Sequence, residues 1–308
     1  MNKRGWGVWL ALTLAAVLLV TGCGPASGGG AGGKLKVTVT TGMIADLVGN
    51  VGKDHVEVTA LMGSGVDPHL YKASEGDIAK LADAQIIFYN GLHLEGRMGD
   101  IFVKMAAQKP TIAVAEGIPK DLLLETAAGT EDPHIWFDVA NWIKALDVVR
   151  DGLVAKDPAH KADYEANAAA YLTQLQELDS YARTQLASIP KEQRVMVTAH
   201  DAFNYFGRAY DVEVMGLQGI STAAEYGLND VQRLVDLLVQ RKIKAVFVES
   251  SVPKRSIEAL VEGARAKGHT VEIGGELFSD AMGAPGTPEG TYLGMVRHNV
   301  DTIVKALK

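Results

Sequence analysis

One stretch between two prolines limits the folds open to this chain. The run from Pro158 to Ile189 contains no glycine and no internal proline, and it is rich in Ala, Leu, Gln and Glu. This composition predicts one helix of about 30 residues, on the order of 45 Å long. Pro158 can begin such a helix and Pro190 ends it. The predicted helix divides the chain into two parts.

Strand-like runs stand on both sides of this helix. They mix β-branched and apolar residues and alternate with helical patterns, which predicts parallel sheets covered on both faces. We expect an α/β fold of two lobes (35–156 and 191–308), each a four-stranded, mainly parallel sheet flanked by helices, joined by a rigid helix at 157–190. The eight runs are LKVTVTT (35–41), VEVTALM (56–62), AQIIFYN (84–90), PTIAVAE (110–116), RVMVTAH (194–200), VEVMGLQ (212–218), KAVFVES (244–250) and TVEIGGE (270–276).

The start of the chain has a different character. Residues 1–22 carry a short basic start and the apolar run WGVWLALTLAAVLLV, which is too short for a comfortable membrane span, and small residues lead to Cys23, the only cysteine. The pattern resembles a bacterial lipoprotein signal, which implies cleavage before Cys23 and a lipid on its sulfur. The alternatives are an ordinary secretory signal or a short membrane anchor. Residues 23–34 are rich in glycine and are expected to form a flexible tether.

The charge of the chain is acidic. The net charge is −7, and removal of residues 1–22 takes away Lys3 and Arg4 and leaves −9. Nucleic-acid binding usually requires a basic face, so we expect no nucleic-acid partner.

Four side chains that can bind metal follow predicted strand ends, where open parallel sheets bind ligands. They are His69, His134, His200 and Asp280. Two come from each predicted lobe, so they could converge on the cleft between the lobes. Each has a structural alternative: a turn at a helix start for His69 and His134, a histidine satisfied at a strand end for His200, and a helix cap for Asp280.

The sequence Asp-Pro-His occurs twice, at VDPHLY (66–71) and EDPHIWFD (131–138). A residue before proline adopts an extended backbone, so Asp67 and Asp132 are each held extended with a histidine two positions on. Their carboxylates could either cap the following turn or orient the imidazole. The related DPAH at 157–160 shows how readily a helix-start version arises.

Eight stretches of the chain resemble, in order, the TroA-like zinc/manganese group (cluster A-I) of solute-binding lipoproteins of bacterial metal ABC transporters. The resemblance implies two α/β lobes joined by one long helix, with one metal ion bound between them by His69, His134, His200 and Asp280. Some manganese-binding relatives carry glutamate at the third of these positions. The stretches are VDPHLY, NGLHLE, DPHIWFD, VTAHDAFNYF, LQGIST, AVFVESSV, IGGELFSDAMG and GTYLGMVRHN.

The identity of the ion is divided between manganese and zinc. Three imidazoles and a carboxylate favour zinc over manganese in raw affinity. The family's zinc-dedicated branch often has a His-rich loop, which is absent here, and the segment ISTAAEYG looks like the manganese-associated branch. Manganese is therefore slightly favoured. We expect binding to weaken below about pH 6, as histidines protonate.

The resemblance implies capture and delivery rather than catalysis. The protein would be monomeric and extracytoplasmic, anchored to the cell membrane by its lipid, and would deliver one ion to an ABC permease with its ATPase subunits. The long helix implies small lobe shifts on release. The alternative is a secreted zinc-dependent hydrolase that uses the same cluster, with Glu249 as its general base; otherwise Glu249 pairs with a ligand or caps its strand. A surface-adhesin role, known for some relatives, has no receptor site in the sequence.

Overall fold

The computed structural model describes residues 33–126 and 129–308, and residues 34–308 form one compact unit. The predicted signal at 1–22, Cys23 and nearly all of the predicted tether lie outside the described residues. Within the described part of the chain, no helix combines the length and apolar character needed to cross a membrane.

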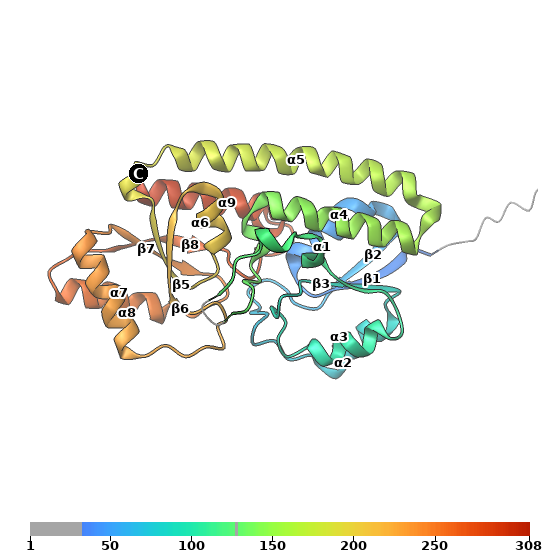
Figure 1. Cartoon of the computed structure of the whole chain (residues 1–308), viewed down its shortest axis with the longest axis horizontal. Helices are drawn as coiled ribbons and strands as arrows, with labels where there is room; N and C mark the ends of the chain where they lie inside the picture. The colour runs from blue at the N-terminus through green and yellow to red at the C-terminus, as the bar shows by residue number, and fades with distance from the viewer. Residues whose placement is uncertain (1–32, 127–128) are drawn as a thin grey trace, which may run out of the picture. The chain divides into compact units, whose positions relative to one another are not determined.

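The N-terminal lobe is built on four parallel strands in the order β2-β1-β3-β4. Alternate residues of β3 face opposite sides of this sheet, as the period of a strand requires. Ile86 and Phe88 join the main core with helices α1 and α4, and Ile87 packs with α2 and α3 on the other side (Figure 1). The elements are β1 (Leu35–Val39), α1 (Gly42–Gly52), β2 (Val56–Ala60), α2 (Glu75–Asp83), β3 (Ile86–Tyr89), α3 (Gly99–Ala106), β4 (Thr111–Ala113) and α4 (Val139–Lys156).

The C-terminal lobe repeats this construction with two parallel strand pairs, β5-β6 and β7-β8. In β7, Ala245 and Phe247 face the main core, whereas Val246 and Val248 face a second core beneath α7 and α8. The elements are β5 (Val195–His200), α6 (Asn204–Tyr210), β6 (Glu213–Gln218), α7 (Leu228–Arg241), β7 (Ala245–Glu249), α8 (Arg255–Ala266), β8 (Glu272–Leu277) and α9 (Tyr292–Leu307).

Helix α5 (Lys161–Ala187) is the long helix between the two sets of strands. Its 27 residues span about 40 Å. It packs on α1 and α4 of the N-terminal lobe and on α9 and α6 of the C-terminal lobe, as Figure 1 shows along the upper edge of the view. Its buried face, which includes Tyr171, Leu175 and Leu178, belongs to the same core as both sheets.

The predicted fold class is confirmed, with two local differences. Strands β5 and β7 lie side by side but share no ladder, and at their carboxyl ends the His200 amide donates to the Glu249 side chain at 2.9 Å instead. Helix α3 begins only at Gly99, although the sequence shows a helical pattern from about residue 95 to 107. The preceding residues Gly91, Leu92 and His93 all have positive φ and form a left-handed turn that a helix cannot include.

Candidate metal site

The structure brings together the four residues that the sequence singled out. His69 lies in the loop after β2, His134 immediately precedes the short 3₁₀ helix η4 (Ile135–Phe137), His200 is the last residue of β5, and Asp280 follows β8. One donor atom from each lies within 4.8 Å of the others, and all four residues are buried. No other group of this kind occurs among the residues that the structure describes. The four donor atoms could hold one metal ion.

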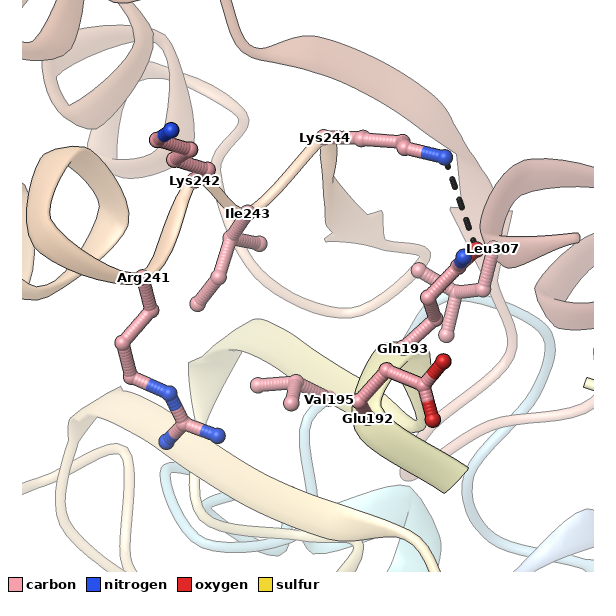
Figure 2. Close-up of a pocket in the computed structure, with 8 residues that line it drawn as sticks. All are labelled: Glu192, Gln193, Val195, Arg241, Lys242, Ile243, Lys244 and Leu307. Carbon is pink, nitrogen blue, oxygen red and sulfur yellow. Dashed lines mark hydrogen bonds between the residues drawn. The ribbon is translucent and has the colours of Figure 1, made fainter. Parts of the chain in front are cut away.

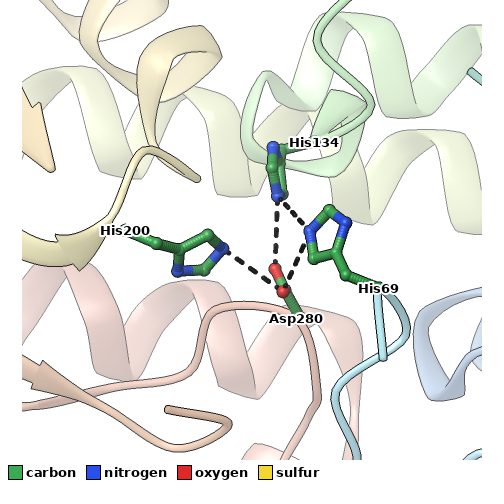
Figure 3. Close-up of side chains that lie close together, drawn as sticks. All are labelled: His69, His134, His200 and Asp280. Carbon is green, nitrogen blue, oxygen red and sulfur yellow. Dashed lines mark hydrogen bonds and ion pairs between the residues drawn. The ribbon is translucent and has the colours of Figure 1, made fainter. Parts of the chain in front are cut away.

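The donor atoms are spaced as ligands of one ion are spaced. Figure 3 shows the three imidazole rings pointing toward the Asp280 carboxylate. The Nε2 atoms of His69 and His200 lie 3.5 and 3.3 Å from Asp280 Oδ2, and His134 Nε2 lies 3.5 Å from Oδ1. The Nε2 atoms of His69 and His134 are 3.3 Å apart. A tetrahedral ion with bonds of 2.0–2.1 Å would separate its ligands by about 3.3–3.4 Å.

Several of these atoms have no other partner. His200 Nε2 and both Asp280 oxygens are buried without a hydrogen bond from any described residue. Buried polar atoms normally have a partner, so an orphaned nitrogen and two orphaned oxygens at one point indicate that something else binds there. A divalent cation satisfies all of them at once, and the residues present fit such an ion.

His134 is held by the aspartate of its own Asp-Pro-His motif. Asp132 Oδ1 accepts hydrogen bonds from the His134 amide at 2.9 Å and from ring Nδ1 at 2.7 Å. A proton on Nδ1 leaves Nε2 with its lone pair directed at the cluster. Residues of the other lobe hold Asp132 in turn: Asn204 donates to its carboxylate and the Tyr205 hydroxyl donates to its carbonyl.

His200 is held in the same way by Glu249, which reaches across from β7. Glu249 accepts from the His200 amide at 2.9 Å and from ring Nδ1 at 2.5 Å. Burial lowers the pKa of His200, but the carboxylates of Glu249 and Asp280 outweigh it, so the pKa lies well above its usual value. Burial likewise raises the pKa of Asp280, yet the histidines, His200 foremost, hold it well below its usual range.

The first Asp-Pro-His motif works differently. Asp67 Oδ1 accepts from the His69 amide at 2.8 Å, and its other oxygen accepts from the Thr222 hydroxyl at 2.6 Å, across the two lobes. Asp67 therefore caps the turn, whereas Asp132 both caps its turn and orients its ring. Burial lowers the pKa of His69 to about 4, although Asp280 opposes the shift, so His69 is neutral at pH 7.

A cavity of about 780 Å³ reaches the cluster on the His69 side. His69, Asp132, Asn204 and Ile220 are among its lining residues, so it is bordered by both lobes. A smaller cavity of about 250 Å³ lies at the opposite end of β5 from His200, beside Val195 (Figure 2). Arg241 and Lys242 line it, and Lys244 there donates to Gln193, so it offers no metal ligands comparable to the cluster.

The sequence did not predict the contacts that Thr222, Asn204 and Tyr205 make with the two aspartates. Their stretches were recognisable only as matches to the family, because each contact joins residues more than 70 positions apart. His93 lines the cavity that reaches the cluster, and the other four histidines lie elsewhere. His55 stacks on His160 with ring centroids 4.0 Å apart, and His269 and His298 bond to carbonyls of the C-terminal lobe.

Comparisons with known proteins agree with this geometry. Residues 37–306 match the family described as zinc-uptake complex component A, periplasmic. The chain is 55% identical over 301 residues to the manganese-binding lipoprotein MntA of Bacillus subtilis (strain 168), covering 97% of this chain and 98% of that one. It is 50% identical over 277 residues to the zinc-binding protein TroA of Treponema pallidum (strain Nichols), covering 90% of each.

Solved structures show the same fold. The periplasmic zinc-binding protein TroA from Treponema pallidum superposes with a TM-score of 0.88 at 50% identity, covering 89% of this chain and 99% of that chain. A manganese-bound periplasmic metal-binding protein from Candidatus Liberibacter asiaticus superposes with a TM-score of 0.79 at 25% identity, covering 89% and 100%. The chain belongs to the family of zinc-uptake complex component A, as its resemblance to the TroA-like proteins implied.

Proposed function

We propose that this protein is the extracytoplasmic solute-binding component of a metal ABC importer. It binds one divalent transition-metal ion through His69, His134, His200 and Asp280 and delivers it to a membrane permease. The observation that carries the proposal is the convergence of four buried donor atoms within 4.8 Å. Two of the four side chains, His200 and Asp280, have buried polar atoms without a hydrogen-bond partner there. Two relatives, one named as a manganese-binding lipoprotein at 55% identity and one named as a zinc-binding protein at 50% identity, support the same role.

Three carboxylates assist the four ligands in this proposal. Asp132 and Glu249 each bond to Nδ1 of a ligand histidine, which fixes the tautomer that leaves Nε2 free for the ion. Asp67 acts on the His69 backbone and fixes its turn. Such partners typically change metal affinity by about 10- to 100-fold.

The cargo is manganese or zinc. The spacing of the donor atoms suits a tetrahedral zinc ion, and a carboxylate that binds through both oxygens would give the five-coordinate site that manganese accepts. Both Asp280 oxygens are orphaned, which leaves the second arrangement open to the side chain. Among the relatives, one is named for manganese and another for zinc. We keep the slight preference for manganese that the absent His-rich loop suggested.

The hydrolase alternative loses its general base. Both Glu249 oxygens accept hydrogen bonds from His200, and Glu249 is only 1% exposed, so its carboxylate is not free to activate a water molecule. Four protein ligands would also fill a tetrahedral site, whereas catalytic zinc keeps one position for water. None of the relatives described above is named as a hydrolase. We therefore propose a binding protein and not an enzyme.

The proposal includes the ends and the partners of the chain. Residues 1–22 would direct export, Cys23 would carry the lipid, and residues 23–34 would tether the body to the cell membrane. The lobes would comprise 35–156 and 191–308, with 157–190 between them, in a monomer that binds a permease and its ATPase subunits. A relative named as a manganese-binding lipoprotein supports the anchor, and one named as a metal ABC transporter substrate-binding lipoprotein supports both the anchor and these partners.

The test is native mass spectrometry of the body from Gly33 onward, stripped of metal and offered zinc or manganese separately. One ion per chain is expected for the wild type and for His298→Ala, which removes a histidine outside the cluster. His200→Ala should lose the ion or bind it much more weakly. Binding that ignores His200 would contradict the proposed site. Uptake of radioactive manganese or zinc by cells lacking the chain, with and without its restoration, would then test the transport role.

A further inference from the structure

A buried carboxylate lies in the N-terminal lobe outside the proposed ligand set. Glu95 is only 4% exposed, and its oxygens accept three hydrogen bonds. Its Oε1 accepts from the Thr40 hydroxyl at 2.6 Å and the Asn90 amide at 2.7 Å, and its Oε2 accepts from the Gly91 amide at 3.3 Å. Burying a charged group costs free energy unless hydrogen bonds or an opposite charge stabilise it. The three donors around Glu95 supply such hydrogen bonds, and we therefore asked what this arrangement holds in place.

Two of the three donors, the backbone amides of Asn90 and Gly91, lie where the chain enters a strained turn. Residues Gly91, Leu92 and His93 have φ values of 86°, 52° and 64°, and side chains other than glycine adopt this region with strain. The turn directs two successive backbone N–H groups at one point and makes an anion-binding concavity. The carboxylate of Glu95 fills that concavity from within the same segment. Glu95 thereby stabilises a conformation that the chain would otherwise avoid.

The turn is connected to the proposed metal site through one side chain. Asn90 is 1% exposed, and its side-chain amide donates to the Pro133 carbonyl at 2.9 Å and to the Gly91 carbonyl at 3.1 Å. Pro133 directly precedes His134. The path therefore runs from the Glu95 carboxylate, through the backbone and side chain of Asn90, to the peptide that carries His134.

We infer that Glu95 is a positioning residue for the metal site, a role that rests on the proposed function. It fixes Asn90, which fixes the peptide before His134 and so the direction of that ring. Glu95 belongs neither to the four-residue cluster nor to the lining of the cavity that reaches His69, and it lines an adjoining cavity of about 620 Å³. Its effect on the ion is therefore transmitted through Asn90 and not made by contact.

The decisive variant is Glu95→Gln, studied in the body from Gly33 onward with cobalt(II) alone as the probe. An amide in place of the carboxylate sets an N–H group against one of the three donors and so disturbs the turn. The size of the side chain stays nearly the same. We expect cobalt(II) affinity to fall by about tenfold or more and the visible spectrum of the saturated protein to change, because that spectrum reports ligand geometry. Asn90→Ala should have the same two effects, and the double variant should be little worse than either single one.

Two controls separate positioning from stability. Glu116→Gln makes the same chemical change at an exposed residue of the same cavity. Leu153→Ala removes buried volume from α4 and lowers stability without touching this path. Both should keep the wild-type affinity and spectrum. If Glu95→Gln does not fold, Asn90→Ala carries the test, since it removes only the bond to Pro133 and Gly91.

The outcomes show separately whether the positioning role of Glu95 fails and whether the proposed metal-binding function fails. A Glu95→Gln protein that melts at lower temperature but keeps wild-type affinity and spectrum would overturn the positioning role, and leave the metal-binding proposal intact. A wild type that binds no cobalt(II), zinc or manganese would overturn both. Equal losses of affinity in Glu95→Gln and Leu153→Ala, matched for melting temperature, would assign Glu95 to stability alone and overturn the inference.

Discussion

Glu249 holds His200 at two points: one carboxylate oxygen accepts from the backbone amide at 2.9 Å and the other from ring Nδ1 at 2.5 Å. The two residues end neighbouring strands, so the contact both replaces a ladder bond between β5 and β7 and aims Nε2 at the other three donor atoms. The Glu249 side chain therefore both links strands β5 and β7 and orients a ring of the candidate metal site.

Glu249→Gln should weaken metal binding by about 10- to 100-fold. The amide can still accept from Nδ1 through its oxygen, but it removes the negative charge that favours a proton there, and its NH₂ group then faces the His200 amide. Competition with a chelator of known affinity measures the loss. Glu276→Gln is the matched control, because it makes the same change on β8 at a partly exposed side chain paired with Lys254. Equal affinities in the two variants would contradict the role of Glu249.

Metal binding at pH 7 should release about one proton per ion. The pKa of His200 lies well above its usual value, because the effect of burial is outweighed by the carboxylates of Glu249 and Asp280, and this favours a proton on the metal-free ring. His69, with a pKa of about 4, is neutral at pH 7. The ion competes with this proton, so affinity should begin to fall at a higher pH than the value of about 6 expected from unperturbed histidines. His69 begins to compete only near pH 4.

Isothermal titration calorimetry in two buffers of different ionisation enthalpy counts these protons. The apparent binding enthalpies should differ by the difference between the two buffer enthalpies, multiplied by the number of protons released. Identical enthalpies in both buffers would mean that no proton is displaced, and that His200 is neutral before the ion arrives.

The two Asp-Pro-His motifs should respond differently to the same substitution. Asp132→Asn removes the anionic partner of the His134 ring, and we expect an affinity loss of about tenfold or more. Asp67→Asn keeps an oxygen for the His69 amide and sets its NH₂ group against the Thr222 hydroxyl, which can also accept. Its loss should be clearly smaller. Equal losses would show that Asp67 also acts on its ring, which its observed bonds do not predict.

The difference between these motifs marks the limit of what the sequence could predict. Parallel strands bring their carboxyl ends to one edge, which is why positions after β2, β5 and β8 predicted side chains that the structure does bring together. The sequence left two roles open for Asp67 and Asp132, because an extended backbone before proline allows either. The choice depends on partners from the other lobe, Thr222 for one and Asn204 for the other.

The left-handed turn at residues 91–93 was equally hidden. Leu92 and His93 carry ordinary side chains that do not signal positive φ, and a helical pattern continues through the residues that follow. Only the buried carboxylate of Glu95 and the donors around it account for the turn. Their role in metal binding, like the role of the four proposed ligands, stays a prediction.

Metal should stabilise the folded body. An ion that binds only the native state at 100 times its dissociation constant adds about 2.7 kcal/mol to the free energy of unfolding. For a body of this size that corresponds to a rise of about 5 °C in melting temperature. Differential scanning calorimetry with and without zinc or manganese measures the rise, which His200→Ala should abolish and His298→Ala should keep. A rise that survives in His200→Ala would place the stabilising ion elsewhere.

The hydrogen bond between Thr222 and Asp67 should slow the release of the ion. It joins the two lobes next to His69 and Ser221, which line the cavity that leads to the cluster, and so it must break whenever the lobes separate there. Thr222→Val removes the hydroxyl and keeps the shape of the side chain. Because Thr222 is half-buried, we expect the substitution to destabilise the conformation with joined lobes by about 1 kcal/mol. The release rate should then rise about fivefold. Stopped-flow mixing of the loaded protein with excess chelator measures this rate. Thr222→Ser keeps the donor and should release the ion as slowly as the wild type, whereas equally fast release from both variants would assign the effect to packing of the loop and not to the bond.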